Sequence, residues 1–435
     1  MLYERWLQVA RSWRTAPAIL DVHTARSWTF ADLEREADSS PLPQRVVHPA
    51  GNGAEFVLDV LRAWRHGRIV CPLDADQTAG SIPEIPRECV HLKLTSASTG
   101  VSRMVAFTAA QLAADADQIV ETMGLRPGWP NVAVISLAHS YGYSNLVLPL
   151  LLHGIPLVVA ESRLPEALRR ACRTRPEVTL PAVPVLWRQW FEAGSIPANI
   201  RLAISAGAPL AVSLERAIHE RHGLKIHNFY GSTECGGIAY DSGCVPRSSE
   251  TWVGHPMRGV DLSVGADGCL EVRGASVGLG YVPPDTLHLG HGRYRSHDLV
   301  EVSHSGVSLL GRATDLINVA GRKVAPETIE RAVSAIPGVA ACLVFGVPEQ
   351  VAGRNEHIVA IVAPSGDAAS GLDLDRIRAD LLQGLPAWQI PREWKVVEKI
   401  PANTRGKISR DAWRQRYLAG ELESAGLMNK PPKGV

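Results

Sequence analysis

Apolar runs and amphipathic stretches alternate along the first half of the chain. The runs at 131–138, 155–160 and 200–205 are short and mostly apolar, whereas the stretches at 165–175 and 214–223 mix apolar and charged positions. Short apolar runs are typical of strands buried on both faces, and the amphipathic stretches have the periodicity of helices that cover such strands. The pattern predicts layered α/β architecture with parallel strands.

From about residue 251 the pattern changes to short strand candidates separated by glycines. The candidates read DLSVG (261–265), CLEVRG (269–274), VGLGYV (277–282), DLVEVS (298–303) and SLLG (308–311). Closely spaced short strands with turn residues between them favour a β-rich subdomain.

The last part of the chain resembles a compact unit of its own. A strand pair after residue 315 is followed by a helix that begins near Pro326, two apolar strands, a helix over 372–385 and a last strand near 392–400. We therefore predict an α/β protein with a large N-terminal domain of layered α/β subdomains and a β-rich subdomain. A small α+β C-terminal domain follows, with the domains at 1–312 and 313–435.

Composition and charge narrow the range of partners. The 435 residues are 46% hydrophobic and 20% charged, and 45 basic side chains against 44 acidic ones leave a formal net charge of +1. This balance gives no field that attracts nucleic acid or an anionic membrane, so we expect small molecules or a small carrier as partners. No apolar stretch reaches the length of a signal peptide or a membrane span, which predicts a soluble, cytoplasmic protein.

The seven cysteines are widely spaced and do not form the pattern of a zinc site or a disulfide scaffold. We expect them to be reduced and mostly structural.

A loop rich in hydroxyls follows the apolar residues that end at Leu94. Its polar and flexible members are Thr95, Ser96, Ser98, Thr99 and Gly100, with Arg103 after them. Hydroxyls and backbone N–H groups of such a loop can surround phosphate oxygens, and the guanidinium adds charge, although the spacing is not that of a Walker loop. A plain surface turn is the alternative interpretation.

Three further segments carry side chains that suit a nucleotide. In HNFYGSTECGG (227–237), Tyr230 can cover an adenine, while Thr233 and Glu234 can hold phosphate and a hard cation. In YRSHDLVEV, Asp298 is expected at a strand start, where its carboxylate can accept hydrogen bonds from ribose hydroxyls. Arg312 follows the next strand. In IPANTRGKISRDAW (400–413), Lys407 is a long cation in a loop. Alone, each motif is also consistent with an ordinary solvated loop or ion pair.

Taken together and in this order, the motifs resemble those of the adenylate-forming superfamily, which includes acyl-CoA synthetases, adenylation domains of nonribosomal peptide synthetases and luciferases. TSASTGVSR is similar to TSG[ST]TGxPK, ISAGAPL to SGGAPL, YGSTE to YGxTE and YRSHD to Y[RK]TGD. GRATDLINVAGRKVAPETIE resembles GRxxDxIxxxGxxVxPxEIE, and PANTRGKISR resembles PxTxxGKxxR. With SWTFADL and LRAWRHGRIVCPLD upstream, the resemblance spans residues 28 to 415 and is that of a shortened acyl- or aryl-acid ligase.

The resemblance implies ATP and Mg²⁺ as cofactors and assigns residues to them. The residues implied to contact ATP are Thr95, Ser96, Ser98, Thr99, Gly100, Arg103, Gly207, Ala208, Asn228, Tyr230, Gly231, Ser232, Asp298 and Arg312. Gly207, Ala208 and Tyr230 would enclose the adenine, and Asn228 would contact its amino group. Glu234 would bind the metal and Thr233 would contact the α-phosphate. Lys407 would lie between the substrate carboxylate and the α-phosphate.

The resemblance also implies a reaction in two steps. A carboxylate would attack the α-phosphate to give an acyl-AMP and pyrophosphate. Because both groups are anionic, the site must supply positive charge to offset their repulsion. The acyl group would pass to a thiol of CoA or of a phosphopantetheine carrier protein after the small, mobile C-terminal domain rotates about Thr314. Gly321 would then line the thiol tunnel, with Arg322 and Lys323 beside it, although Gly321 can also simply serve a turn.

The same resemblance implies the acid-binding residues, and it also implies a catalytic role for His139. The acid-binding residues are His139, Tyr141, Gly142, Ser205, Phe229, Cys235 and Gly236. The segment 136–154 contains no Asp that could pair with an α-ammonium group, which favours an aryl or fatty acid. His139 can equally gate the site or pack in the core.

Several positions depart from the family pattern. Ala97, Ser102 and Arg103 replace Gly, Pro and Lys, and His297 stands where Gly precedes the aspartate. The segment between 74 and the phosphate loop is also short, which leaves room for a homodimer contact or a more open acid site. An amide synthetase and a non-catalytic homologue that binds nucleotide or acyl-AMP therefore stand beside the acid–thiol ligase as alternatives.

Overall fold

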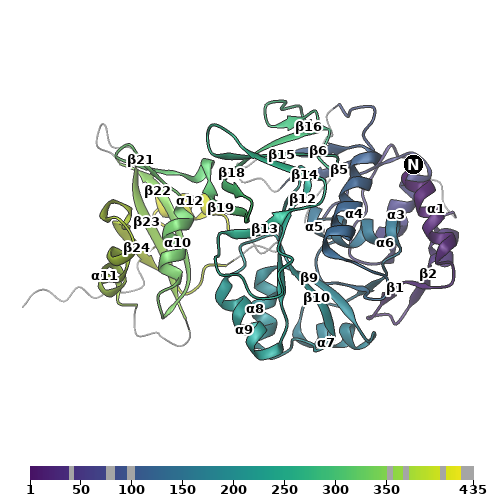
Figure 1. The fold of residues 1–435 in the computed structure, drawn as a ribbon, viewed down its shortest axis with the longest axis horizontal. Coiled ribbons are helices and arrows are strands. Elements are labelled where there is room, and N and C mark those ends of the chain that lie inside the picture. The colour runs from purple at the N-terminus through teal and green to yellow at the C-terminus, as the bar shows by residue number, and fades with distance from the viewer. Residues whose placement is uncertain are drawn as a thin grey trace, which may run out of the picture. The chain divides into compact units, whose positions relative to one another are not determined.

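The computed structural model describes residues 1–38, 44–74, 84–95, 103–349, 356–365, 372–401 and 408–422 (Figure 1). These residues form two compact units. The first contains Met1–Ser296 and Glu301–Ser308, and the second contains His297–Val300 and the described residues from Leu309 onward. The mixed α/β class with a large N-terminal and a small C-terminal part is confirmed. The boundary after Arg312 stays a prediction.

A ladder of parallel strands forms the centre of the first unit. In spatial order its strands are β1 (Pro17–Asp21), β8 (Leu157–Val159), β7 (Asn131–Ala133), β9 (Val178–Ala182), β10 (Ile200–Ser205) and β11 (Ile226–Ser232). The antiparallel strands β12 (Gly236–Tyr240) and β13 (Trp252–Pro256) continue the sheet beyond β11. The apolar runs at 131–138, 155–160 and 200–205 supply three of these strands, because their side chains are buried on both faces.

Helices flank this ladder, and in the view of Figure 1 α4 to α6 lie above β9 and β10, α7 lies below them, and α8 and α9 lie to their left. The helices of this unit are α1 (Leu2–Ser12), α2 (Phe30–Ala37), α3 (Ala54–Arg65), α4 (Ala109–Met123), α5 (Ser140–Gly142), α6 (Leu148–His153), α7 (Pro165–Arg173), α8 (Pro184–Glu192) and α9 (Val212–His222). Helix α4 begins with a capping box between Thr108 and Gln111, and α9 ends at Gly223 in the left-handed conformation. The amphipathic stretches at 165–175 and 214–223 correspond to α7 and α9.

A second sheet carries the start of the predicted phosphate loop. Its order is β16 (Gly280–Val282), β6 (Met104–Phe107), β5 (His91–Leu94), β4 (Ile69–Val70) and β3 (Val46–Val47). Strand β16 comes from VGLGYV, which the spacing assigned to the β-rich subdomain, yet it pairs with β6. The reason is burial, because Val282 completes an apolar cluster with Leu92 and Ala106.

The β-rich part is built from β14 (Val260–Val264), β15 (Cys269–Gly274), β17 (Leu289–Gly290), β18 (Arg293–Ser303) and β19 (Gly306–Arg312). Strands β18 and β19 contribute residues to both units. The expectation that Asp298 lies at a strand start is wrong. The sequence from Arg293 to Ser303 forms one continuous strand with Asp298 in its middle.

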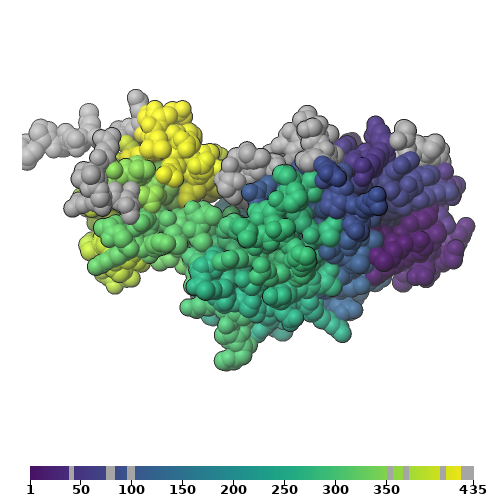
Figure 2. Space-filling view, turned by 90° about the horizontal axis from the view of Figure 1, so that it is seen from above, coloured from purple at the N-terminus to yellow at the C-terminus, as the bar shows by residue number. Residues whose placement is uncertain are grey.

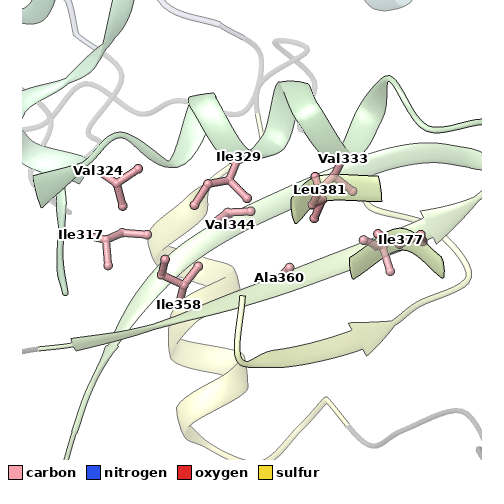
Figure 3. Close-up of a cluster of buried hydrophobic side chains, with 10 residues drawn as sticks. Ile317, Val324, Ile329, Val333, Val344, Ile358, Ala360, Ile377 and Leu381 are labelled. Atoms are coloured by element: carbon pink, nitrogen blue, oxygen red, sulfur yellow. The ribbon is translucent and has the colours of Figure 1, made fainter. Parts of the chain in front are cut away.

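The second unit contains the predicted strand pair β20 (Ile317–Val319) and β21 (Arg322–Val324), and a three-stranded sheet. The sheet consists of β22 (Val339–Pro348), β23 (Glu356–Pro364) and β24 (Glu393–Val396), with helices α10 (Pro326–Ser334) and α11 (Leu374–Gly384). Figure 3 shows Ile329 and Val333 of α10 directed toward Val344 and Ala360, where they form the unit's core. A further helix, α12 (Arg410–Leu418), was not predicted, and Figure 2 shows these last described residues at the surface in yellow.

Within the described ranges, no helix combines the length and the apolar composition that crossing a membrane requires. All seven cysteines are free thiols, and five of them are buried.

Candidate active site

Two residues close the base of the predicted phosphate loop. The backbone N–H of Thr95 donates to the carbonyl of Arg103 at 2.8 Å, and the backbone N–H of Arg103 donates to the Thr95 hydroxyl at 3.1 Å. Both follow from the pairing of Leu94 with Met104 in β5 and β6. Ser96, Ser98, Thr99 and Gly100, with the departures Ala97 and Ser102, lie outside the described residues.

The residues assigned to adenine lie on or just after two neighbouring parallel strands. Gly207 and Ala208 follow β10, while Asn228 and Tyr230 belong to β11, with Gly231 and Ser232, also assigned to ATP, at its end. The carboxyl ends of adjacent parallel strands meet at one edge of a sheet, and ligands bind at such edges in α/β folds. Asn228 is buried and its side-chain amide donates to the carbonyl of Val253 at 3.3 Å.

A buried charge network that the sequence patterns did not reveal anchors this edge. Glu215 accepts hydrogen bonds from Lys225 and from Arg247, and Arg247 also donates to the carbonyl of Leu210 at 2.6 Å. Lys225 pairs with Asp241 at 2.5 Å as well. Every charge here has a partner, so the network fixes the segment that carries Gly207 relative to β11.

Gly207 adopts a φ of +88°, where a side chain is strained although a Cβ would meet only a methyl group of Val183 within 4 Å. We expect Gly207→Ala to lower the free energy of unfolding by about 1 kcal/mol and to weaken ATP binding several-fold. The matched control is Gly223→Ala, which has a φ of +62° in open space after α9. Urea unfolding and calorimetric ATP titration of both variants check this, and equal ATP affinities would contradict the adenine assignment.

Glu234 is held at both its backbone and its carboxylate. Its carbonyl accepts the backbone N–H of Gly278 at 2.8 Å, and its Oε1 accepts the Tyr281 hydroxyl at 2.9 Å. Thr233, beside it, is half-buried. Among the described residues no three His, Cys, Asp or Glu side chains gather as a metal cage. A single held carboxylate fits Mg²⁺, which typically takes one or two protein carboxylates and completes its shell with phosphates and water.

Asp298 and Arg312, the residues assigned to ribose, form an ion pair in the second unit. Arg312 Nε lies 2.9 Å from Asp298 Oδ1 across the neighbouring strands β18 and β19. His297 precedes Asp298 on β18 and is exposed, as the alternation of side chains along a strand requires when its neighbour faces inward.

A buried ion pair connects three segments of the site. Lys93 of β5 and Asp115 of α4 are 4% and 1% exposed, with 3.5 Å between Lys93 Nζ and Asp115 Oδ2. The hydroxyl of Ser144 donates to the same Asp115 oxygen at 2.5 Å, and the other oxygen contacts the backbone N–H of Gly237 at 3.4 Å. Asp115 therefore joins the strand before the predicted phosphate loop to the π-helical turn that carries Ser144 and to the start of β12 after Glu234.

Four of the residues assigned to the acid, His139, Tyr141, Gly142 and Phe229, lie on the helical segment after β7 and on β11. The ring centroids of Tyr141 and Phe229 are 5.9 Å apart. Burial raises the pKa of the Tyr141 phenol, and the nearby Tyr240 raises it further. His139 is the N-cap residue of α5, which continues into a turn of π-helix over Tyr143–Val147, a feature often found at functional sites. Gly142 has no room for a side chain, because a Cβ would overlap the carbonyl of Ser136.

Ser205 is separated from this group. It pairs in register with Asn228, so its side chain shares a face with Asn228 and points away from the face of Phe229. Cys235 is buried beside Asp115, burial raises the pKa of its thiol, and Gly236 follows it against the carboxylate of Asp115.

In the second unit, Arg410 forms ion pairs with carboxylates from segments near the predicted hinge. Thr314 donates to Asp315 at 2.9 Å, and Asp315 pairs with Arg410. Arg410 also contacts Glu327 at 3.0 Å and Glu330 at 3.1 Å. Lys407 lies outside the described residues, three positions before this anchor, whose role no sequence motif had suggested.

Of the predicted tunnel residues, Gly321 lies in the turn between β20 and β21, and Arg322 and Lys323 begin β21. Gly321 adopts a φ of +84°, and its N–H donates to the side chain of Asn318 at 3.0 Å. Arg322 and Lys323 are exposed, and Arg322 lies over the ring of Trp388 at 5.7 Å.

Two protein-family models match the chain. Residues 82–282 match the model of the AMP-binding enzyme family, and residues 328–407 match that of the AMP-binding enzyme C-terminal domain. Together the two ranges cover more than half of the chain.

Individual relatives extend over most of the chain. A probable 2-succinylbenzoate–CoA ligase of Mycobacterium tuberculosis is 28% identical over 401 residues, which cover 87% of this chain and 100% of the relative. A 2,3-dihydroxybenzoate–AMP ligase of Bacillus subtilis is 26% identical over 423 residues, 90% of this chain and 74% of the relative.

A solved structure shares the fold. The ATP-bound MatB of Rhodopseudomonas palustris superposes with a TM-score of 0.83 at 20% identity, over 96% of this chain and 98% of that one. The resemblance predicted from the motifs is confirmed, and the chain belongs to the AMP-binding enzyme family of adenylate-forming ligases.

Proposed function

We propose that this protein uses ATP and Mg²⁺ to convert an aryl or fatty acid into an acyl-AMP and then transfers the acyl group to a thiol. The observation that carries the proposal is that Arg103 and Glu234 both contact Tyr281, the first at its ring and the second at its hydroxyl. A predicted phosphate-binding cation and a predicted metal-binding carboxylate, which are far apart in sequence, thus contact the same side chain. The names of the relatives support an aryl acid in particular.

In this proposal the chain's own residues position the reactants. Gly207, Ala208 and Tyr230 hold the adenine, Arg103 contacts the outer phosphates, and Glu234 with Thr233 faces the α-phosphate. When bound, Mg²⁺ neutralises phosphate charge so that the carboxylate can approach. Lys407 contributes a further positive charge between the two anions, and no side-chain nucleophile is required.

The thiol step is assigned to the second unit. Thr314 would act as the hinge, and Gly321 would line the path of a pantetheine arm, where the absence of a side chain leaves room. CoA is supported by the names of the relatives as the acceptor, and a carrier protein is the other candidate thiol donor. The cytoplasmic location and the homodimer stay predictions.

The test is acid-dependent pyrophosphate release with aryl, short-chain and long-chain acids, followed by product analysis with CoA, a carrier protein and an amine. We expect release with aryl acids and a thioester product. An amide as the only product would replace the thiol step by amide synthesis. Bound ATP without pyrophosphate release from any acid would favour the non-catalytic alternative.

A further inference from the structure

Tyr281 contacts two residues, Glu234 and Arg103, that the proposed function assigns to ATP. It is the middle residue of β16, pairs with Val105 of β6 and is 8% exposed. Its hydroxyl donates to Oε1 of Glu234 at 2.9 Å, and the guanidinium carbon of Arg103 lies 5.4 Å from its ring centroid. One side chain therefore touches both the predicted metal ligand and the predicted phosphate ligand.

The phenol is suited to orient a metal-binding carboxylate. The hydroxyl of Tyr281 donates its proton to Oε1 of Glu234, with 2.9 Å between the two oxygens. The hydrogen bond occupies Oε1 and fixes the plane of the carboxylate, which leaves Oε2 for a cation. Hydrogen bonds of this kind to metal ligands set both the geometry and the affinity of a site.

The ring face of Tyr281 and a nearby carboxylate hold Arg103. Arg103 Nη1 lies 3.0 Å from Asp285 Oδ2, and Asp285 follows Tyr281 closely in the chain. Burial would raise the pKa of Asp285, but hydrogen bonds from His288 and Arg103 outweigh it and lower that pKa. The aspartate is therefore ionised, and it keeps the guanidinium over the ring at the base of the phosphate loop.

We propose that Tyr281 is a positioning residue that organises both ends of the triphosphate site. Its hydroxyl orients Glu234 for Mg²⁺, and its ring, with Asp285, holds Arg103 ready for the phosphates. This inference rests on the proposed assignment of Glu234 and Arg103 to ATP. It adds two residues, Tyr281 and Asp285, that no sequence motif had suggested.

The experiment measures ATP binding by calorimetry over a series of Mg²⁺ concentrations, without any acid. We expect Tyr281→Phe to raise the Mg²⁺ concentration for half-maximal ATP affinity about tenfold and to leave ATP affinity in EDTA unchanged, because the ring remains. Tyr281→Leu should in addition weaken ATP binding in EDTA about two- to fivefold. Tyr417→Phe is the matched control, because it removes a Tyr–Glu hydrogen bond in the second unit.

A double variant makes the assignment specific. In the background of Glu234→Gln, adding Tyr281→Phe should produce no further change in the Mg²⁺ dependence, because the carboxylate that the hydroxyl orients is gone. A Mg²⁺ dependence of Tyr281→Phe equal to wild type, or an equal loss with and without Mg²⁺, would overturn the proposal. Because no acid is present, the result is independent of whether pyrophosphate release occurs, so failure of the proposed reaction remains distinguishable.

Discussion

Lys407→Ala should lower acid-dependent pyrophosphate release at least about a hundredfold. The attacking carboxylate and the α-phosphate are both anionic, and the lysine ammonium is proposed to offset their repulsion in the transition state. The measurement is the initial rate of pyrophosphate release at saturating ATP and acid. Lys399→Ala is the matched control, because Lys399 is an exposed lysine of the same unit.

The second half-reaction gives this prediction a further check. Acyl-AMP supplied from outside should react with the thiol at nearly the wild-type rate in Lys407→Ala, because the lysine is assigned only to acyl-AMP formation. Equal loss of both half-reactions would point to a damaged fold, and an unaffected first step would remove Lys407 from the mechanism.

Lys93→Met should lower the free energy of unfolding by about 3–5 kcal/mol, because it leaves the Asp115 carboxylate buried without its cation. Asp115→Asn should lower the free energy of unfolding by a similar amount, because it leaves the buried Lys93 ammonium without its anionic partner. The double variant removes both charges and should be much less destabilised than the sum of the two. Urea unfolding of all four proteins gives the coupling energy.

The helix that carries Asp115 provides the control for that cycle. Asp117, two residues later on α4, pairs with Arg5 at 2.5 Å and contacts His153 at 2.9 Å, but it is 42% exposed, so Asp117→Asn should cost clearly less than Asp115→Asn. If the Lys93 and Asp115 changes were simply additive, the two residues would not form an energetically coupled pair.

The sequence predicted those parts of the fold that depend on local pattern. The amphipathic stretch that became α7 and the apolar run that became β10 needed no distant partner to be recognised. The motifs likewise singled out Glu234 and Asp298 as candidate site residues, because residue types and their order carry that signal. Their surroundings were not predictable in the same way.

The missed features depend on contacts between distant segments. Tyr281 reaches Glu234 only because β16 pairs with β6, about 175 residues earlier in the chain, and local periodicity does not specify such pairing. Lys93 stands in a strand where its charge argued for exposure, and only Asp115 on another element explains its burial. Helix α12 was missed because it is strongly polar, and Arg410 anchors it through three carboxylates.

Gly236 has a consequence for attempts to redesign acid selectivity. A Cβ at this position would overlap Oδ1 of Asp115, and its φ of +72° already disfavours any other residue. Mutant libraries that vary position 236 alone should therefore return almost only glycine among folded clones. We expect positions 115 and 236 to be epistatic, because a side chain at 236 would need a shorter residue at 115, and Lys93 would then also have to be replaced by a neutral residue.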